Sequence, residues 1–557
     1  MQRRILLFLL IALVIYGCKP AEYGFRKKDI NAAQRLYGLD FEDEAVDTMY
    51  NYLGRNKRGY DNLREYSIDN ETFPALTFDP HPSGFIMPQG NQEILFPAVP
   101  NDVQLPATDE EIAFLSIPEL ASLLKSRKLS SERLTNIYLD RIEKFDGQLQ
   151  SVITVTRDLA LEQARRADQE IASGNYRGIL HGIPYGVKDL MAVEGYPTTW
   201  GAEPYRNQQI DYTATVVKRL EEQGAVLIAK LVSGSLARGD VWFGGKTKNP
   251  WDLSQGASGS SAGSGSATSA GLVAFSLGTE TLGSITSPAT RNGVTGLRPT
   301  YGRISRHGVM SLSWSMDKVG PICRSAEDCE IVLSAIYGKD PLDPTTNLVP
   351  FATNSSNPRD FKIAILQEDI SSDSTSESGK NLIAAVELLK KELNTAFESV
   401  ELPSEFPYRA FDIILRAESG AFFDQLVRSG EVDNMVEQTE GSRANSLRQA
   451  RFIPAVEYLQ ANRERRRLIE EVNQLFRDYD VIIAPTFRSR QMQITNLTGH
   501  PVISIPTGFD DQGRPTSMTL IGNLYEEDKI LNLARYYQQL TSFDDQHPPL
   551  FYSKGNK

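Results

Sequence analysis

Cysteine is scarce in this chain, with three residues among 557. Two of them, Cys323 and Cys329, lie close together but have no pair of histidines nearby, so a metal site is not expected there. The sequence leaves a disulfide between them open and favours packing in a core for both. Ser325 is predicted to cap a helix that carries Cys329 in its first turns.

An excess of positive charge is also lacking. The chain has 59 Lys and Arg against 71 Asp and Glu, a formal net charge of -12, which argues against a nucleic-acid partner held through its phosphates. No apolar run beyond residue 15 is long enough to cross a membrane, and no internal repeat is evident. The length suits two to four domains or one large α/β enzyme with extensions.

Residues 1–18 have the pattern of an export signal. Arg3 and Arg4 precede an apolar stretch, residues 5–15, that is too short to span a bilayer. The stretch ends in Ile-Tyr-Gly-Cys instead of an Ala-x-Ala cleavage site, and so resembles a bacterial lipobox. That resemblance implies acyl chains on Cys18, which would anchor the exported protein to the membrane on its periplasmic or cell-surface side. The alternative is an ordinary secretory peptide with an incidental cysteine.

The chain is predicted to contain four segments. These are a lipoprotein-type signal peptide over residues 1–18, a helical and irregular N-terminal extension over 19–110, a catalytic domain over 111–545 and a C-terminal tail over 546–557. Amphipathic helices are expected from Ile117 onward, with Ser130 capping the second of them. The sequence leaves open whether the extension covers the site or holds a second copy in a homo-oligomer.

Glycine and serine make up half of the segment from Ser254 to Ser287, which also contains the apolar run Leu272 to Leu277. A flexible linker would carry no buried strand. The pattern predicts a turn, a small-residue helix, a strand and a second glycine turn that ends at Ser284. Upstream, Lys188 ends a short strand among apolar neighbours. Most such lysines reach solvent, whereas a buried one would have a lowered pKa.

Several motifs resemble those of the amidase signature hydrolases in order and spacing. They are GIPYGVKDL at 182–190, GSSAG at 259–263, GTETLGSITSPA at 278–289 and GVTGLRPTYGRIS at 293–305. The resemblance extends from Ile117 to Leu540. It implies an α/β amidase signature fold, in which helices flank both faces of a central, mixed and twisted β-sheet. It also implies an enzyme that hydrolyses an amide C–N bond without a metal or cofactor.

The family mechanism, carried onto matching positions, makes Ser284 the nucleophile, Ser260 the bridging hydroxyl and Lys188 the general base. A serine hydroxyl needs a base to remove its proton, and lysine can be that base only when neutral, a form that burial favours. Ser260 would pass the proton from Ser284 to Lys188 and later return it to the departing amine. In the family, the peptide bond at the middle serine is cis.

The oxyanion hole is expected from consecutive backbone N–H groups in the turn after the strand, those of Thr281, Leu282, Gly283 and Ser284. Glu280, Leu282 and Thr286 stand where the family usually has Asp, Gly and Arg. A positive φ at Leu282 would strain the turn, whereas an ordinary φ would change only the shape of the pocket.

Other residues near the motifs have competing interpretations. GSSAG also matches the G-x-S-x-G nucleophile elbow, which would make Ser261 the nucleophile, but no clear strand leads into it and His500 lies at the start of a strand. His181 is expected to cap or pack, because the relay leaves it no task. Asp189 is expected either to hold backbone amides or to raise the pKa of Lys188.

The sequence therefore predicts an exported, lipid-anchored serine hydrolase that forms an acyl-enzyme at Ser284 and releases a carboxylic acid and ammonia or an amine. Its expected partners are a small-molecule amide and, through Cys18, the membrane. The acyl pocket is expected from helices after Phe361 and from the loop at 196–200.

Two other functions are weighed against this one. The first is an amidase-fold binding protein whose catalysis has been weakened at Leu282 and Thr286, and retention of all three triad residues argues against it. The second is the glutaminase subunit of a tRNA-dependent amidotransferase, which an export signal would separate from tRNA.

Overall fold

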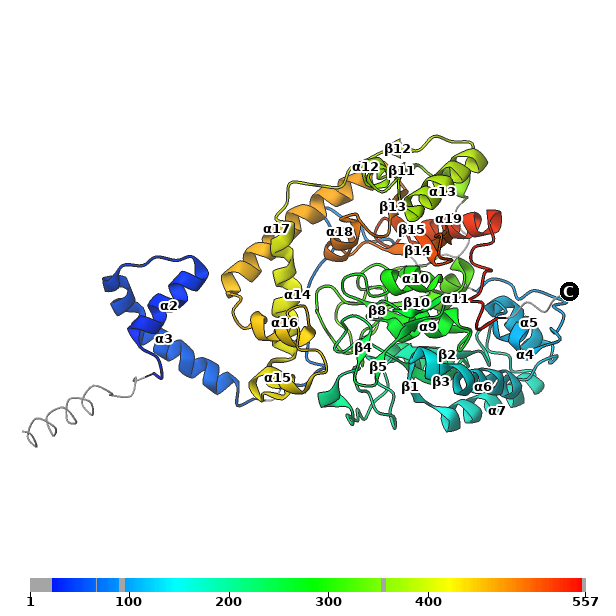
Figure 1. Cartoon of the computed structure of the whole chain (residues 1–557), viewed down its shortest axis with the longest axis horizontal. Helices are drawn as coiled ribbons and strands as arrows, with labels where there is room; N and C mark the ends of the chain where they lie inside the picture. Colours follow the sequence, from blue (N-terminus) through cyan, green and yellow to red (C-terminus); the bar gives the residue numbers. More distant parts are fainter. Residues whose placement is uncertain (1–22, 67, 90–95, 352–356, 553–557) are drawn as a thin grey trace, which may run out of the picture. The chain divides into compact units, whose positions relative to one another are not determined.

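The computed structural model describes residues 23–66, 68–89, 96–351 and 357–552. Cys18 and the predicted signal peptide lie outside these residues. The chain divides into two compact units, Met1–Thr72 and Phe73–Lys557 (Figure 1). Residues 73–110 of the predicted extension therefore belong to the same compact unit as the motifs. The segment boundaries expected at 18, 110 and 545 stay predictions.

The described part of the first unit contains two helices, α2 (Lys27–Tyr37) and α3 (Asp43–Leu63). Helix α2 ends at Gly38, whose left-handed backbone lets its N–H close on the carbonyl of Gln34. The rings of Tyr23, Phe25 and Tyr50 pack together beside the helices. This unit is thus a small helical pair with an aromatic cluster.

The second unit is built on an 11-stranded sheet in the order β1-β3-β2-β8-β10-β9-β14-β15-β13-β11-β12. The strands are β1 (Val152–Val155), β2 (Pro184–Lys188), β3 (Val226–Leu231), β8 (Phe275–Glu280), β9 (Thr295–Arg298), β10 (Lys318–Cys323), β11 (Ile363–Ile365), β12 (Glu398–Ser399), β13 (Val481–Pro485), β14 (Val502–Phe509) and β15 (Pro515–Gly522). Strand β2 pairs in parallel with β3 and β8, whereas β10 is antiparallel to β8 and β9. The sheet is therefore mixed. Two small hairpins, β4 (Val241–Trp242) with β5 (Gly245–Lys246) and β6 (Lys248–Asn249) with β7 (Asp252–Gly256), stand outside it.

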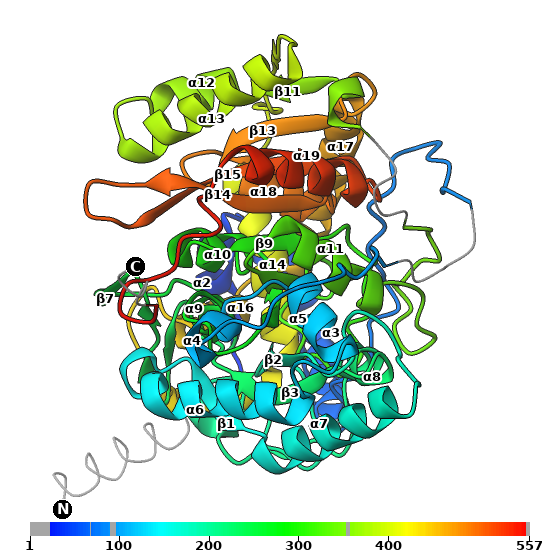
Figure 2. The same ribbon diagram turned by 90° about the vertical axis from the view of Figure 1, so that its right-hand side faces the viewer.

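Helices flank this sheet. They are α4 (Asp109–Ala113), α5 (Ile117–Lys125), α6 (Ser131–Leu149), α7 (Arg157–Ala172), α8 (Thr215–Glu222), α9 (Ala262–Ser269), α10 (Thr286–Asn292), α11 (Ala326–Ile336), α12 (Gln367–Ser372), α13 (Glu377–Leu393), α14 (Tyr408–Phe422), α15 (Asp424–Arg428), α16 (Arg443–Ala450), α17 (Ala455–Leu475), α18 (Gln491–Thr498) and α19 (Glu527–Leu540), with short 3-10 turns at Glu203–Tyr205, Pro358–Asp360 and Glu431–Asn434. Figure 2 shows α6 and α7 beside the β1, β3 and β2 end, and α19 along β14 and β15. The predicted α/β class with a central mixed sheet is confirmed.

Local signals in the sequence set several helix starts. The hydroxyl of Ser130 accepts a hydrogen bond from the Arg133 N–H at the start of α6, and Ser325 does the same for Asp328 in α11, as predicted. Cys323 and Cys329 are buried and free, so the prediction that both pack in the core is confirmed. No helix in the described residues is long and apolar enough to cross a membrane.

Candidate active site

Lys188 lies at the end of β2, in the interior of the sheet. Its neighbours β3 and β8 are buried along their whole length, and the Lys188 side chain is itself fully buried. Its Nζ donates hydrogen bonds to Ser260 Oγ at 2.7 Å and to Thr279 Oγ1 at 2.8 Å. Burial lowers the pKa of Lys188 to about 7, although the carboxylates of Asp317 and Glu280 act in the opposite direction. A neutral amine is therefore available near neutral pH.

Ser260 is held in a tight turn between β7 and α9. The Gly259–Ser260 peptide bond is cis, and the Ser260 carbonyl accepts a hydrogen bond from the Gly234 N–H at 3.0 Å. A Cβ atom on Gly259 would lie 1.8 Å from the Gly239 carbonyl oxygen, so a larger residue would push the two loops apart. This close approach fixes where the Ser260 hydroxyl meets Lys188.

Ser284 lies on the turn that joins β8 to α10. Its carbonyl accepts a hydrogen bond from the Ser261 N–H at 3.2 Å, which ties this turn to the Ser260 turn. Ser284 is 9% exposed and Ser260 only 1%, so Ser284 is the more exposed of the two residues. Within the described residues, no hydrogen bond joins the two hydroxyls. The structure thus brings Lys188, Ser260 and Ser284 to one place, with the Lys188–Ser260 contact already formed.

The backbone of the turn before Ser284 decides whether Leu282 strains it. Gly283 has a φ of +85°, whereas Leu282 is not among the described residues with positive φ. A Cβ on Gly283 would lie 2.5 Å from Met492 Sδ. In the described part of the chain, the N–H groups of residues 282–284 donate to no protein acceptor. Leucine therefore fits the backbone without strain and alters only the pocket wall, where it is 38% exposed.

Glu280 organises the far end of the same turn. Its carboxylate accepts hydrogen bonds from the N–H groups of Ile285 at 2.8 Å and Thr286 at 2.9 Å. It also pairs with Arg298 at 2.7 Å and accepts from Asn496. Burial alone would raise the pKa of Glu280, but Arg298 and these donors hold it at about 2. Glutamate at this position therefore stays ionised and fixes the start of α10.

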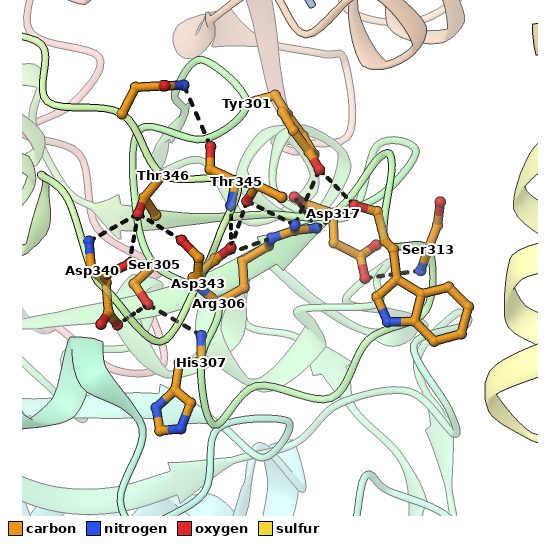
Figure 3. Close-up of polar contacts among 12 residues, drawn as sticks. Tyr301, Ser305, Arg306, His307, Ser313, Asp317, Asp340, Asp343, Thr345 and Thr346 are labelled. Carbon is orange, nitrogen blue, oxygen red and sulfur yellow. Dashed lines mark hydrogen bonds and ion pairs between the residues drawn. The ribbon is translucent and has the colours of Figure 1, made fainter. Parts of the chain in front are cut away.

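Asp317 also holds the serine turn, through its contact with Thr281. It accepts hydrogen bonds from the Thr281 hydroxyl and from the N–H groups of Leu312 and Ser313. The loop that carries Asp317 is held by Arg306, which donates to the Trp314 carbonyl at 2.8 Å and to the Asp317 carbonyl at 3.4 Å (Figure 3). A buried polar network thus extends from the RPTYGRIS motif to the serine turn.

Asp189, which directly follows Lys188, has the first of its two expected roles. Its carboxylate accepts a hydrogen bond from the Thr199 N–H at 2.8 Å and pairs with Lys230 Nζ at 2.8 Å. His181 is buried, its Nδ1 accepts a hydrogen bond from the Arg177 N–H at 3.0 Å, and its Nε2 lies 3.0 Å from a carboxylate oxygen of Glu170, so of its two expected roles it has the packing one.

The residues of the alternative nucleophile elbow are engaged elsewhere. Ser261 is buried, its hydroxyl donates to the Thr279 carbonyl at 3.1 Å, and it accepts from the Thr279 N–H at 3.2 Å. His500 is also buried, bonded to Thr498 and stacked on Phe476. Neither side chain contacts the other, which favours Ser284 over Ser261.

Arg443 is a residue near the site that the sequence analysis did not single out. From the start of α16 it donates to the carbonyls of Leu236 at 3.0 Å and Ala237 at 3.2 Å. Both of these residues have left-handed backbones, with φ of 46° and 58°, a conformation that costs energy for any side chain and persists only where contacts hold it. Arg443 thus clamps the loop that begins at Gly234, whose N–H binds Ser260.

A small cavity of about 250 Å³ lies beside Leu282 of the serine turn, and none of Lys188, Ser260 and Ser284 is among its lining residues. Leu282 and Arg238 line it together with residues from α14, α16 and the segment before α16, namely Asp412, Leu415, Arg416, Glu440, Gly441, Ser442, Ser446 and Gln449. Helices after Phe361 thus form one wall. The predicted loop at 196–200 does not line this cavity, because Trp200 packs against Phe422 and Phe423 instead.

Comparisons with known proteins agree with this geometry. The sequence model of the family described as Amidase matches residues 133–495. A glutamyl-tRNA(Gln) amidotransferase subunit from Rippkaea orientalis is 34% identical over 481 residues, which cover 78% of this chain and 99% of that protein. The solved peptide amidase of Stenotrophomonas maltophilia is 28% identical with a TM-score of 0.69, covering 78% of this chain and 98% of that one.

A further solved structure, of a vestigial protein complex that reveals the evolutionary origins of an s-triazine catabolic enzyme, is 29% identical with a TM-score of 0.70. It covers 76% of this chain and 98% of its own. The chain therefore belongs to the amidase signature family. Members of this family are hydrolases that act on the C–N bonds of amides, and this chain is an enzyme of that class.

Proposed function

We propose that this protein hydrolyses a small carboxamide through a Ser284 acyl-enzyme, with Ser260 as proton relay and Lys188 as general base. The observation that carries the proposal is the buried Lys188, whose Nζ lies 2.7 Å from Ser260 Oγ and whose pKa is lowered to about 7. A base poised near the working pH combines the right protonation state with enough driving force for proton transfer. The small cavity beside Leu282 is the proposed place of the substrate.

The proposed reaction forms an acyl-enzyme and then hydrolyses it. Ser284 Oγ forms a bond to the substrate carbonyl carbon while its proton passes to Ser260 and the Ser260 proton passes to neutral Lys188. The carbonyl oxygen becomes an oxyanion, which the N–H groups of residues 281–284 stabilise. Collapse breaks the C–N bond, and the relay in reverse gives the amine its proton. Water then attacks the acyl-enzyme by the same route and releases the carboxylic acid.

A serine-directed fluorophosphonate tests this proposal on a truncated protein that begins at residue 19. We expect one adduct per chain, located on Ser284 by peptide mapping. A folded protein that forms no adduct would instead support the non-catalytic binding protein, whose oxyanion turn no longer works.

Gly283 and Leu282 provide a matched pair of variants in the proposed oxyanion hole. Gly283→Ala is expected to slow adduct formation about 10²-fold, because its φ of +85° and the 2.5 Å approach to Met492 would force the turn to move. Leu282→Ala keeps an ordinary φ and should stay within about tenfold of wild type. The labelling rate is measured for both variants. Equal losses of rate in the two would show that these N–H groups do not act as proposed.

Arg443→Met is expected to slow labelling about 10- to 100-fold, because it frees the Leu236 and Ala237 carbonyls and lets the loop behind Ser260 shift. Arg443→Lys, which can still reach one carbonyl, should recover part of the rate. The measurement is the labelling rate beside the thermal unfolding midpoint. If Arg443→Met has the wild-type unfolding midpoint and the wild-type labelling rate, the hydrogen bonds of Arg443 to the loop have no effect on Ser260.

Export and lipid anchoring through Cys18 are a separate part of the proposal, supported by the sequence of residues 1–18 alone. The expected result is that cells take up a fatty-acid analogue into the wild-type protein, that globomycin blocks its processing, and that Cys18→Ala abolishes the label. An unlabelled wild-type protein would contradict the lipid anchor.

A second candidate function is that of one component of a tRNA-dependent amidotransferase. It is favoured by the 34% identity to a protein of that name over 99% of its length. The two functions differ in what the purified chain does alone. Hydrolysis of simple carboxamides without any partner supports the free amidase, whereas activity that appears only with partner proteins and charged tRNA supports the amidotransferase.

A further inference from the structure

A larger cavity, of about 800 Å³, lies apart from the serine turn. One wall is the segment 73–79, which we call the strap, and the other walls come from α14, the end of α16 and α17. Neither Lys188, Ser260, Leu282 nor Ser284 lines it. The strap precedes residues 133–495, the part of the chain that the family model matches.

Side-chain contacts hold the strap in place as a wall. The Arg465 guanidinium lies 3.5 Å from the ring centre of Phe78, and Phe78 also packs edge-on against Tyr301 at 5.0 Å. Arg306 lies 5.6 Å from the ring of Phe73 at the other end of the strap. Just beyond the strap, the Ser83 N–H donates to the Glu470 carboxylate of α17.

The helices that face the strap keep the space open with small residues. The lining includes Ala417, Gly420 and Ala421 of α14, Ala450 of α16 and Ala455 of α17. Protein interiors normally close such gaps, because an unfilled space loses dispersion contacts along its lining. A volume of about 800 Å³ falls within the range of small-molecule sites.

The charged side chains at the base of the cavity already have hydrogen-bond partners within the protein. Glu418 accepts hydrogen bonds from Ser313, from Ser315 and from Tyr458. Arg465 donates to the Leu497 carbonyl at 2.6 Å and to Ser315. Among the described residues, Glu418 and Arg465 therefore need no hydrogen bond from a charged ligand.

The remaining lining is mostly hydrocarbon and aromatic. Phe73, Leu76 and Trp314 contribute from the strap and the Asp317 loop, and Leu459 contributes from α17. Leu76 is 79% exposed and Leu459 53% exposed, so the rim shows apolar surface to water. Covering such surface with a ligand is favourable in proportion to the area buried.

We propose that the strap cavity is a second ligand site, which binds an uncharged small molecule through its hydrocarbon part. Ligand and strap together would complete the packing between α14 and α17. This site needs no step of the amide chemistry and is independent of the proposed function.

The test uses the neutral dye N-phenyl-1-naphthylamine, whose fluorescence rises in apolar surroundings. Ala421→Trp and Ala455→Trp place an indole in the cavity from positions that are exposed, so folding is preserved. Ala172→Trp, exposed at the end of α7, is the matched control. We expect wild type and control to bind the dye with the same Kd, and both cavity variants to raise it at least about tenfold.

Thermal unfolding midpoints and the molar mass in solution accompany these titrations. Unchanged midpoints with weaker dye binding support the site, and a charged analogue of the dye should bind less tightly than the neutral one. Non-saturable dye binding to wild type, or the same Kd in all variants, would show that the cavity takes no such ligand. A dimer that Ala421→Trp dissociates would show instead that this face joins two copies.

Discussion

Ser284→Ala is expected to abolish the fluorophosphonate adduct and to lower amide hydrolysis by about 10⁴-fold or more. The reason is that Ser284 is more exposed than Ser260 and lies on the proposed oxyanion turn, whereas Ser260 is engaged by Lys188. Intact mass and peptide maps measure the adduct directly.

Ser261→Ala is the control for this experiment. Its hydroxyl is bonded to Thr279 within the fold, so the variant should lose some stability but keep the adduct on Ser284. Loss of the adduct in Ser261→Ala together with its survival in Ser284→Ala would reverse the assignment and favour the nucleophile elbow.

Lys188→Met is expected to slow labelling by about 10²- to 10⁴-fold, because it keeps the buried volume and removes the base. In the wild type, the labelling rate should rise with pH and level off above about pH 7. Because burial lowers the pKa of Lys188 to about 7, its amine is neutral, and able to accept a proton, above that pH. Below it, each pH unit should cost about tenfold in rate.

The labelling rate is measured between roughly pH 5.5 and 8.5, a range that includes this pKa. Thr279→Val provides a second check, because it removes the other contact of Lys188 Nζ while the base remains. Thr279→Val should shift the pH at which the labelling rate is half its maximum, and it should lose less rate than Lys188→Met. A flat profile in the wild type, or a Lys188→Met protein labelled at the wild-type rate, would contradict the role of Lys188.

The candidate site could be predicted in large part because its residues lie in short, dense motifs. Ser260, Ser284 and Lys188 each stand at the end of a strand or in a turn, where local sequence sets the backbone. Thr279, which accepts a hydrogen bond from Lys188, also lies inside one of these motifs, but the motif alone does not mark it as a partner of the lysine. Alternation along β8 places Thr279 on the same face of the sheet as Leu277. Asp317 and Arg443 lie in segments without a recognisable motif.

Leu282 shows the limit of reading a motif by itself. The sequence allows two outcomes for Leu282, strain in the turn or only a changed pocket wall, and the φ angle of Leu282 decides between them. That angle is set by contacts on both sides of the turn, from Glu280 to the start of α10 and from Asp317 to Thr281. The strap cavity is a similar case, because its walls come from residues about 380 positions apart in the chain.

The helix caps at Ser130 and Ser325 follow from local sequence alone. The α/β class and the three residues that meet at the site were predicted through contiguous motifs that resemble those of the amidase signature family. The tertiary structure decided that Lys188 is fully buried, that Asp189 pairs with Lys230, and that Arg443 holds the loop behind Ser260. Burial and ion pairing depend on which distant segments pack together, and that information is spread over the whole chain.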